Sequence, residues 1–227
     1  GHVVPDIPYI SDAATYSPES CVFGQLINIG CVLLGIFVYI RYRQIEQLIY
    51  YHPDLQETSE RMNKIAMWLG IGSCLGCSIV ANFQETNIRI MHYVGALNCF
   101  GLRTVYFWMQ ASLTYNIHPY VGSLRLAHAR LGLPVLCTIF FTVVAVTGII
   151  SHILFKGKDP RKWYPSDGGW RYHVASSISE WIVATIFCFY ILSFTDEFKI
   201  ISIDHPPIAI AGYEIINIQS TENDENA

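Results

Sequence analysis

The sequence predicts an all-α protein, a polytopic bundle of transmembrane helices. Five stretches of the 227-residue chain are mostly apolar, and each has about the 20 residues that a helix needs to cross a bilayer. Because lipid offers the backbone no hydrogen-bond partner, such stretches form helices. Charged residues make up only 14% of the chain, against roughly 25% in a typical soluble domain. The five predicted spans lie at about 22–40, 65–81, 90–115, 131–154 and 172–194.

The segments between the spans set the expected orientation. No Lys or Arg precedes the first span, whereas Arg41 and Arg43 close it, and basic residues are typical of cytoplasmic loops. We therefore expect residue 1 outside and, after five spans, a flexible cytosolic tail over residues 199–227. The five basic residues between 155 and 171 run against this orientation. No basic stripe with interleaved aromatics is present, so the expected partner is the lipid bilayer and not nucleic acid.

The seven cysteines predict no disulfide framework, because six of them lie inside apolar stretches. Cys74 and Cys77 have the spacing of a metal-ligand pair, but no second pair accompanies them. Packing as small hydrophobic side chains is the favoured interpretation, and no cofactor or metal is expected. Gly72 and Gly76 of the same span form a GxxxG motif, which lets two backbones approach closely, and we expect it to pack within the bundle.

Glu180 is the most unusual residue in the predicted spans. It lies about two turns inside the fifth span, where a lone charge costs about 2.5–3.5 kcal/mol on insertion scales. Arg103 of the third span is the candidate ion-pair partner, since the depth difference of roughly 7 Å is within the reach of an arginine side chain. His92 shares a helix face with Arg103 and could meet both. A structural ion pair is favoured over a proton relay, a substrate site or a gate, and the histidine spacings do not predict a hydrolase.

Polar segments at the ends of spans are further candidates. Asn82, Phe83 and Gln84 end the second span, where the amides either cap helix carbonyls or bind a lipid headgroup, and capping is the commoner explanation. These residues lie on the same side as the proline-rich loop 5–21, and we expect the two segments to pack together. In the tail, Tyr213 and Ile216 fit the tyrosine-x-x-bulky pattern read by endocytic adaptors, a candidate sorting signal.

Together these motifs resemble the damage-regulated autophagy modulator (DRAM) family, part of the wider Frag1/DRAM/Sfk1 group with the TMEM150 proteins. The matching residues occur in family order from residue 8 to about residue 198, so the resemblance covers nearly the whole chain. Arg103 does not carry over from the family. The residues that carry the resemblance are Pro8, Tyr9, Ile10, Ser11, Asp12, Pro18, Glu19, Ser20, Cys21, Phe23, Gly24, Asn28, Arg41, Tyr42, Ser78, Ile79, Val80, Ala81, Asn82, Phe83, Gln84, His92, Gly95, Ala96, Trp163, Pro165, Tyr172, His173, Val174, Glu180, Trp181, Phe194, Asp196 and Phe198.

The resemblance implies a membrane domain over residues 1–198 and six spans in a complete family member, with the Pro8-Tyr9-Ile10-Ser11 motif after the first. The chain begins Gly1-His2-Val3 and is therefore expected to lack that first span. The implied function is non-enzymatic modulation of autophagy in the lysosomal or endosomal membrane, through unidentified membrane or cytosolic protein partners. The plasma membrane is the alternative location. The alternative function is a transporter, channel or lipid-handling protein that uses Glu180 inside the bundle.

Overall fold

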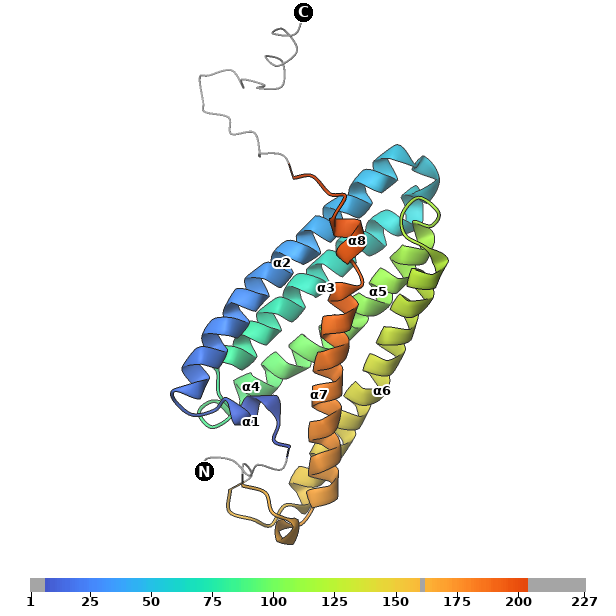
Figure 1. The fold of residues 1–227 in the computed structure, drawn as a ribbon. Helices are drawn as coiled ribbons and strands as arrows, with labels where there is room; N and C mark the ends of the chain where they lie inside the picture. The colour runs from blue at the N-terminus through green and yellow to red at the C-terminus, as the bar shows by residue number, and fades with distance from the viewer. Residues whose placement is uncertain (1–6, 160–161, 204–227) are drawn as a thin grey trace, which may run out of the picture.

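A computed structural model describes residues 7–159 and 162–203, except for the side chains of residues 56–58. Every regular element in these ranges is a helix, and no strand occurs in them. The long helices pack side by side into one elongated bundle (Figure 1). The predicted all-α class is therefore confirmed. The candidate sorting signal at Tyr213 and Ile216 lies outside the described residues, as does most of the predicted tail.

The helices follow one another in an up-and-down order. The first half of the chain forms α1 (Ile10–Ala13), α2 (Glu19–Tyr51), the short turn η1 (Pro53–Leu55) and α3 (Gln56–Asn82). A continuous helical stretch then comprises α4 (Arg89–Ala96), the π-helical segment η2 (Leu97–Leu102) and α5 (Arg103–Asn116). The last elements are α6 (Leu124–Leu154), the turn η3 (Pro165–Asp167), α7 (Trp170–Leu192) and α8 (Thr195–Phe198).

Four helical stretches of the described chain are long and apolar enough to cross a membrane: Glu19–Tyr51, Ser59–Asn82, Leu124–Leu154 and Trp170–Phe198. The predicted third span corresponds to α4, η2 and α5, a stretch whose regular α-helical turns are interrupted by the π-helical segment. Large apolar side chains cover the outside of the long helices, among them Leu26 and Leu33 of α2 and Ile149 and Ile153 of α6. This distribution suits a bundle whose solvent is lipid.

Two expectations about helix limits are wrong. Helix α2 does not end at Arg41 and Arg43 but continues to Tyr51. Arg41 does not mark a membrane edge, since its side chain turns into the bundle and is fully buried. The proline-rich segment 5–21 is not entirely a loop, since it contains α1 and the first turn of α2.

The GxxxG motif of α3 brings backbones together inside the bundle. A Cβ atom added at Gly76 would lie only 2.6 Å from the backbone nitrogen of Cys99 in η2, and one added at Gly95 of α4 would lie 3.0 Å from the Gly76 carbonyl oxygen. Only glycine allows this approach, so α3 packs closely on the α4–η2 stretch, as the motif predicts.

Candidate functional sites at the two ends of the bundle

At one end of the bundle, which we call the α1 end, helix α7 holds the chain segment that leads into α1 (Figure 1). The Ser177 hydroxyl donates a hydrogen bond to the backbone oxygen of Ile7 at 2.7 Å, and the Trp181 indole N–H donates to the oxygen of Pro8 at 3.0 Å. The backbone N–H of Ile10 donates to the Glu180 carboxylate at 2.9 Å. Three side chains of α7 therefore bind three backbone groups of residues 7–10, the segment that leads into α1.

An aromatic cluster completes the α1 end. The Tyr9 ring meets the edge of the His173 ring at a centroid distance of 5.1 Å, and Trp163 stacks on the same imidazole at 4.4 Å. The Trp163 indole is 1% exposed and donates to the backbone oxygen of Gly168 at 2.7 Å. Burial raises the pKa of the Tyr9 hydroxyl above its ordinary value, so this group remains a neutral phenol. The segment, the loop after α6 and the first turn of α7 thus form one packed cap.

The predicted Glu180–Arg103 ion pair is wrong. Glu180 is occupied by the N–H of Ile10, whereas the Arg103 Nε atom lies 3.4 Å from the Ser73 hydroxyl and its guanidinium lies 4.8 Å from the Phe187 ring centroid. The third member of the expected group, His92, makes a 2.8 Å hydrogen-bond contact with the backbone oxygen of Phe83 through Nδ1. The depth argument located these residues along the membrane but not around the helix axes.

Asn82 links α3 to α2 through side-chain hydrogen bonds. Its amide nitrogen donates to the Asn28 side-chain oxygen at 3.0 Å and to the Ser78 backbone oxygen at 2.7 Å. The Ser78 hydroxyl donates to the same Asn28 oxygen at 2.7 Å. The Gln84 side chain bonds locally, accepting from the Asn87 amide at 3.1 Å. These contacts order the end of α3, and the turn after α3 lies at the same end of the bundle as α1 (Figure 1).

The remaining candidate motif residues belong to α1 and to the start of α2. Ser11 and Asp12 belong to α1, and Asp12 is buried with 5% of its surface exposed. Pro18 immediately precedes α2, and Glu19 is its first residue. Most of the candidate residues predicted from the sequence therefore lie in the cap or at the contact between α2 and α3, whereas Arg103 lies deeper in the bundle.

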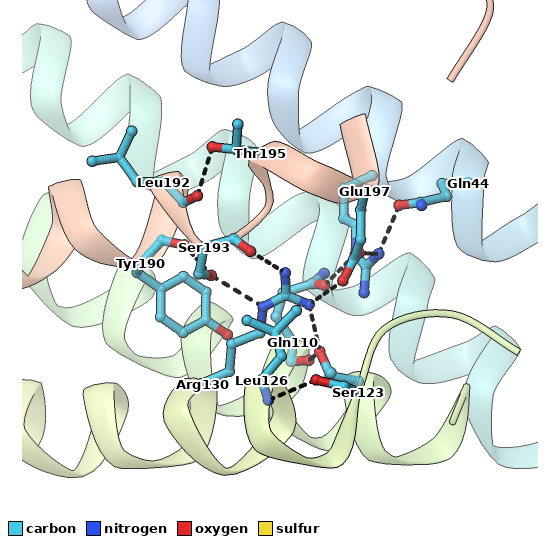
Figure 2. Close-up of polar contacts among 12 residues, drawn as sticks. Gln44, Gln110, Ser123, Leu126, Arg130, Tyr190, Leu192, Ser193, Thr195 and Glu197 are labelled. Atoms are coloured by element: carbon cyan, nitrogen blue, oxygen red, sulfur yellow. Dashed lines mark hydrogen bonds and ion pairs between the residues drawn. The ribbon is translucent and has the colours of Figure 1, made fainter. Parts of the chain in front are cut away.

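At the opposite end, which we call the α8 end, a buried ion-pair network joins three helices. The Glu197 carboxylate of α8 accepts from Arg41 Nη1 of α2 at 2.6 Å and from Arg130 Nη1 of α6 at 2.7 Å. Both arginine side chains are fully buried, and Glu197 is 5% exposed. Figure 2 shows Arg130 and Glu197 facing each other, with Gln44 and Gln110 beside them.

Further donors and acceptors satisfy most of the network. Arg41 Nε donates to the Gln110 side-chain oxygen at 3.1 Å, and Arg130 bonds both the hydroxyl and the backbone oxygen of Ser193, at 3.0 and 2.7 Å. The Phe194 ring lies under both guanidinium groups, at 4.9 Å from Arg41 and 3.6 Å from Arg130. Such cation–π contacts are stronger when the cation is desolvated. The network thus holds α8 and the end of α7 against α2, α5 and α6.

Sequence reasoning missed this network. Arg41 was expected at a membrane edge, and the family resemblance pointed to Asp196, which is exposed and pairs with Lys199 at 2.8 Å. The inward-facing acid is its neighbour Glu197. The available signal was a carboxylate directly after an apolar span, on the same membrane side as Arg41 and Arg130, but the pattern does not say which of two adjacent acids faces inward.

Comparison with known proteins agrees with these observations. The Frag1/DRAM/Sfk1/Cwh43P N-terminal domain model matches residues 1–201. The chain is 34% identical over 205 residues to bovine (Bos taurus) DNA damage-regulated autophagy modulator protein 2, covering 89% of this chain and 76% of that protein. It is also 34% identical over 204 residues to mouse (Mus musculus) DNA damage-regulated autophagy modulator protein 1, covering 89% and 82%.

A third relative aligns with a smaller part of the chain. Modulator of macroautophagy TMEM150B-B of Xenopus laevis is 38% identical over 139 residues, which is 61% of this chain and 57% of that protein. No solved structure matches the chain. A family model that spans almost all of the described bundle, together with relatives aligned over most of their own length, identifies the chain as a member of the Frag1/DRAM/Sfk1 family.

Proposed function

We propose that the protein is a non-enzymatic modulator of autophagy that resides in endolysosomal membranes. The observation that carries the proposal is the 34% identity over 89% of the chain to relatives named as autophagy modulators. The relatives include DRAM proteins and a TMEM150 protein named as a modulator of macroautophagy, so the shared activity is regulation. The protein would act through partners in the membrane or at its surface.

The arrangement of the α1 end supports a binding or scaffolding role over transport. Glu180, the residue on which a transport mechanism would depend, accepts a hydrogen bond from the backbone of Ile10. Its neighbours Ser177 and Trp181 bind the same segment through backbone oxygens. A carboxylate used in this way stabilises a folded cap.

The proposal is tested by autophagic flux in cells that lack the protein. Flux is measured as the accumulation of a lipidated autophagosome marker when lysosomal degradation is blocked, with and without DNA damage. Re-expression of the protein should return the flux of the depleted cells to the parental level. Trp181→Phe, which removes one bond to the cap, is compared with Trp108→Phe, which removes an indole bond to Thr138 in the bundle at 3.0 Å. Equal flux in parental and depleted cells under both conditions would refute the proposal.

The location is tested separately by fractionation and imaging with endosomal, lysosomal and plasma-membrane markers. We expect the intact protein to co-migrate with endolysosomal membranes. Tyr213→Ala should shift it to the cell surface if the tail carries the sorting signal. A protein that is found at the plasma membrane before this substitution would contradict the proposed location, while leaving the flux result to decide the function.

A further inference from the structure

A small cavity lies inside the bundle, with walls that come from α2, α3, α5 and α7 (Figure 1). Its volume is about 20 Å³, which is enough for a small polar group, since a water molecule needs about 10–15 Å³ on the same scale. Three polar side chains line it, Ser73 of α3 and Arg103 and Tyr106 of α5. The cavity is therefore a candidate binding site away from both ends of the bundle.

Two of these side chains carry a buried polar atom without a hydrogen-bond partner in the described part of the chain. These atoms are Nη2 of Arg103 and the hydroxyl oxygen of Tyr106, and the two residues are 7% and 3% exposed. A buried donor that is left unpaired costs the free energy of its desolvation. Because both residues line one cavity, a ligand with two acceptor oxygens would pair with both.

Arg103 also lacks a counter-charge among the described residues. Its Nε atom lies 3.4 Å from the Ser73 hydroxyl, its guanidinium lies 4.8 Å from the Phe187 ring centroid, and no described carboxylate pairs with it. The acids Glu180 and Glu197 are engaged at the two ends of the bundle. A cation at this depth in the membrane is costly unless something offsets it, so the expected ligand is an anion.

The cavity has apolar walls toward the lipid. Leu34 and Phe37 of α2 and Ile191 of α7 line it, and these three residues are half-buried, whereas Arg103 and Tyr106 are buried. The cavity therefore leads from the lipid-facing surface between α2 and α7 to the guanidinium. Helix packing agrees with an opening there, because α2 packs mainly on α3 and α7 packs mainly on α6.

The opening lies at the depth of the acyl chains. Leu34 and Ile191 belong to the apolar stretches 22–40 and 172–194, which cross the hydrocarbon core of about 30 Å. A phospholipid head group lies at the membrane interface, outside this core. A non-esterified fatty acid has a single chain and a head group no larger than a carboxylate, which suits both the apolar walls and the small volume.

We propose that this cavity binds a long-chain fatty acid, with Arg103 and the Tyr106 hydroxyl donating to the two carboxylate oxygens and the acyl chain lying between α2 and α7. Hydrogen bonds from a guanidinium to a carboxylate are strong because both groups are charged. Ligand pockets are typically apolar with a few polar groups that fix the orientation of the ligand. The π-helical segment η2 ends at Leu102, immediately before Arg103, and π-helical turns are frequent at functional sites. This site does not depend on the proposed role in autophagy.

Close packing fixes the position of the Tyr106 ring before a ligand binds. A Cβ atom added at Gly70 of α3 would lie 3.2 Å from this ring and 2.7 Å from the Val38 side chain of α2. The ring is therefore held where α2, α3 and α5 meet. A donor that is already positioned loses little conformational freedom on binding, which favours affinity.

The first test is photolabelling of the intact protein in phosphatidylcholine nanodiscs. The probe is a palmitic acid analogue with a diazirine in its chain, and labelled peptides are identified by mass spectrometry. We expect saturable labelling of the peptides that contain Leu34, Phe37 or Ile191. Excess oleate should remove this labelling, whereas methyl oleate, which has the same chain without the charge, should not.

Three outcomes of the photolabelling would overturn the proposal. Labelling that does not saturate is the result expected if only water fills the cavity. Removal by methyl oleate as effective as removal by oleate would show that the carboxylate is not recognised. Removal by phosphatidate as effective as removal by oleate would assign the site to an interfacial phosphate head group instead of a fatty acid.

The second test removes the two donors separately and measures the oleate dissociation constant by competition with the probe. Tyr106→Phe deletes only the hydroxyl and should raise the constant roughly three- to tenfold, whereas Arg103→Gln should raise it more than about tenfold. Tyr42→Phe is the matched control, because it deletes a hydroxyl that donates to Glu46 at 2.8 Å outside the cavity. The control should bind oleate as the unmodified protein does.

Thermal unfolding separates loss of the site from loss of the fold. In nanodiscs free of fatty acid, Tyr106→Phe should unfold at the same or a higher temperature than the unmodified protein, because the change removes a buried group that has no partner. Oleate should raise the midpoint of the unmodified protein more than that of Tyr106→Phe. If Arg103→Gln does not fold, Tyr106→Phe still decides the matter, since equal oleate affinity in Tyr106→Phe and Tyr42→Phe would overturn the proposal.

Discussion

Replacing Glu197 by glutamine removes the one negative charge that lies between two fully buried guanidinium groups. The carboxylate contacts Arg41 at 2.6 Å and Arg130 at 2.7 Å. Breaking a buried ion pair by removing one partner costs about 3–5 kcal/mol, because the remaining charge stays buried without compensation. The glutamine retains one oxygen and keeps the side-chain shape, so the loss reports mainly on charge.

The assay is thermal unfolding of the purified protein in a mild detergent. A loss of about 3–5 kcal/mol lowers the midpoint by about 6–20 °C in a chain of this size. Asp196→Asn is the matched control, because Asp196 is the adjacent acid, is 91% exposed and pairs only with Lys199. An exposed pair of this kind contributes little to stability, because solvent screens the two charges.

A double variant separates the ion pair from general damage. In Arg130→Gln/Glu197→Gln the two losses should not add, since the groups share one network and residues in contact couple by about 0.5–3 kcal/mol. If Glu197→Gln shifts the unfolding midpoint no more than Asp196→Asn does, the ion-pair network does not stabilise the fold as the distances indicate. Full additivity of the losses of stability at Arg130 and Glu197 would show the same.

Three further predictions concern other parts of the bundle. Trp181→Phe removes an indole donor to the docked segment and should cost about 1 kcal/mol, seen as faster hydrogen exchange at residues 9–13; unchanged exchange would contradict the cap. Gly76→Ala should destabilise the bundle by about 1–3 kcal/mol in thermal unfolding, because its Cβ has no room, whereas Gly132→Ala, with nothing within 4 Å, should be neutral or stabilising. The hydrogen bond to Asp54 raises the pKa of Tyr120. The stabilising effect of this hydrogen bond is therefore present below the ordinary tyrosine pKa and is lost as the pH rises through the raised pKa of Tyr120. Ultraviolet titration should show the pKa of Tyr120 falling in Asp54→Asn.

The helical type of the long apolar stretches followed from hydropathy alone, whereas their number did not, since four described stretches and not five are long and apolar enough to cross a membrane. Each apolar stretch of about 20 residues must satisfy its own backbone in lipid, whatever its neighbours do. For the same reason Gly72 and Gly76 could be assigned to a helix contact before the neighbour was known. The ends of the helices were harder to predict. Arg41 was expected at the limit of a span, whereas it is a buried residue inside α2.

Partners of buried charges could not be found in this way. The depth difference between Glu180 and Arg103 is within the reach of an arginine side chain, but pairing also requires that the two side chains face each other around their helix axes. The partner of Glu180 is the backbone N–H of Ile10, a group that no count of charged residues can identify. Glu197 was hidden for a related reason, because the choice between it and Asp196 depends on how α8 folds back onto α2 and α6.

The sequence by itself determined that this protein is a helical membrane bundle of the Frag1/DRAM/Sfk1 family, because hydropathy and motif order are properties of the chain read along its length. Only the tertiary structure decided that α7 binds the segment before α1 and that Arg41, Arg130 and Glu197 close the other end. Those arrangements depend on helix rotation and register, which arise from packing between segments far apart in the chain.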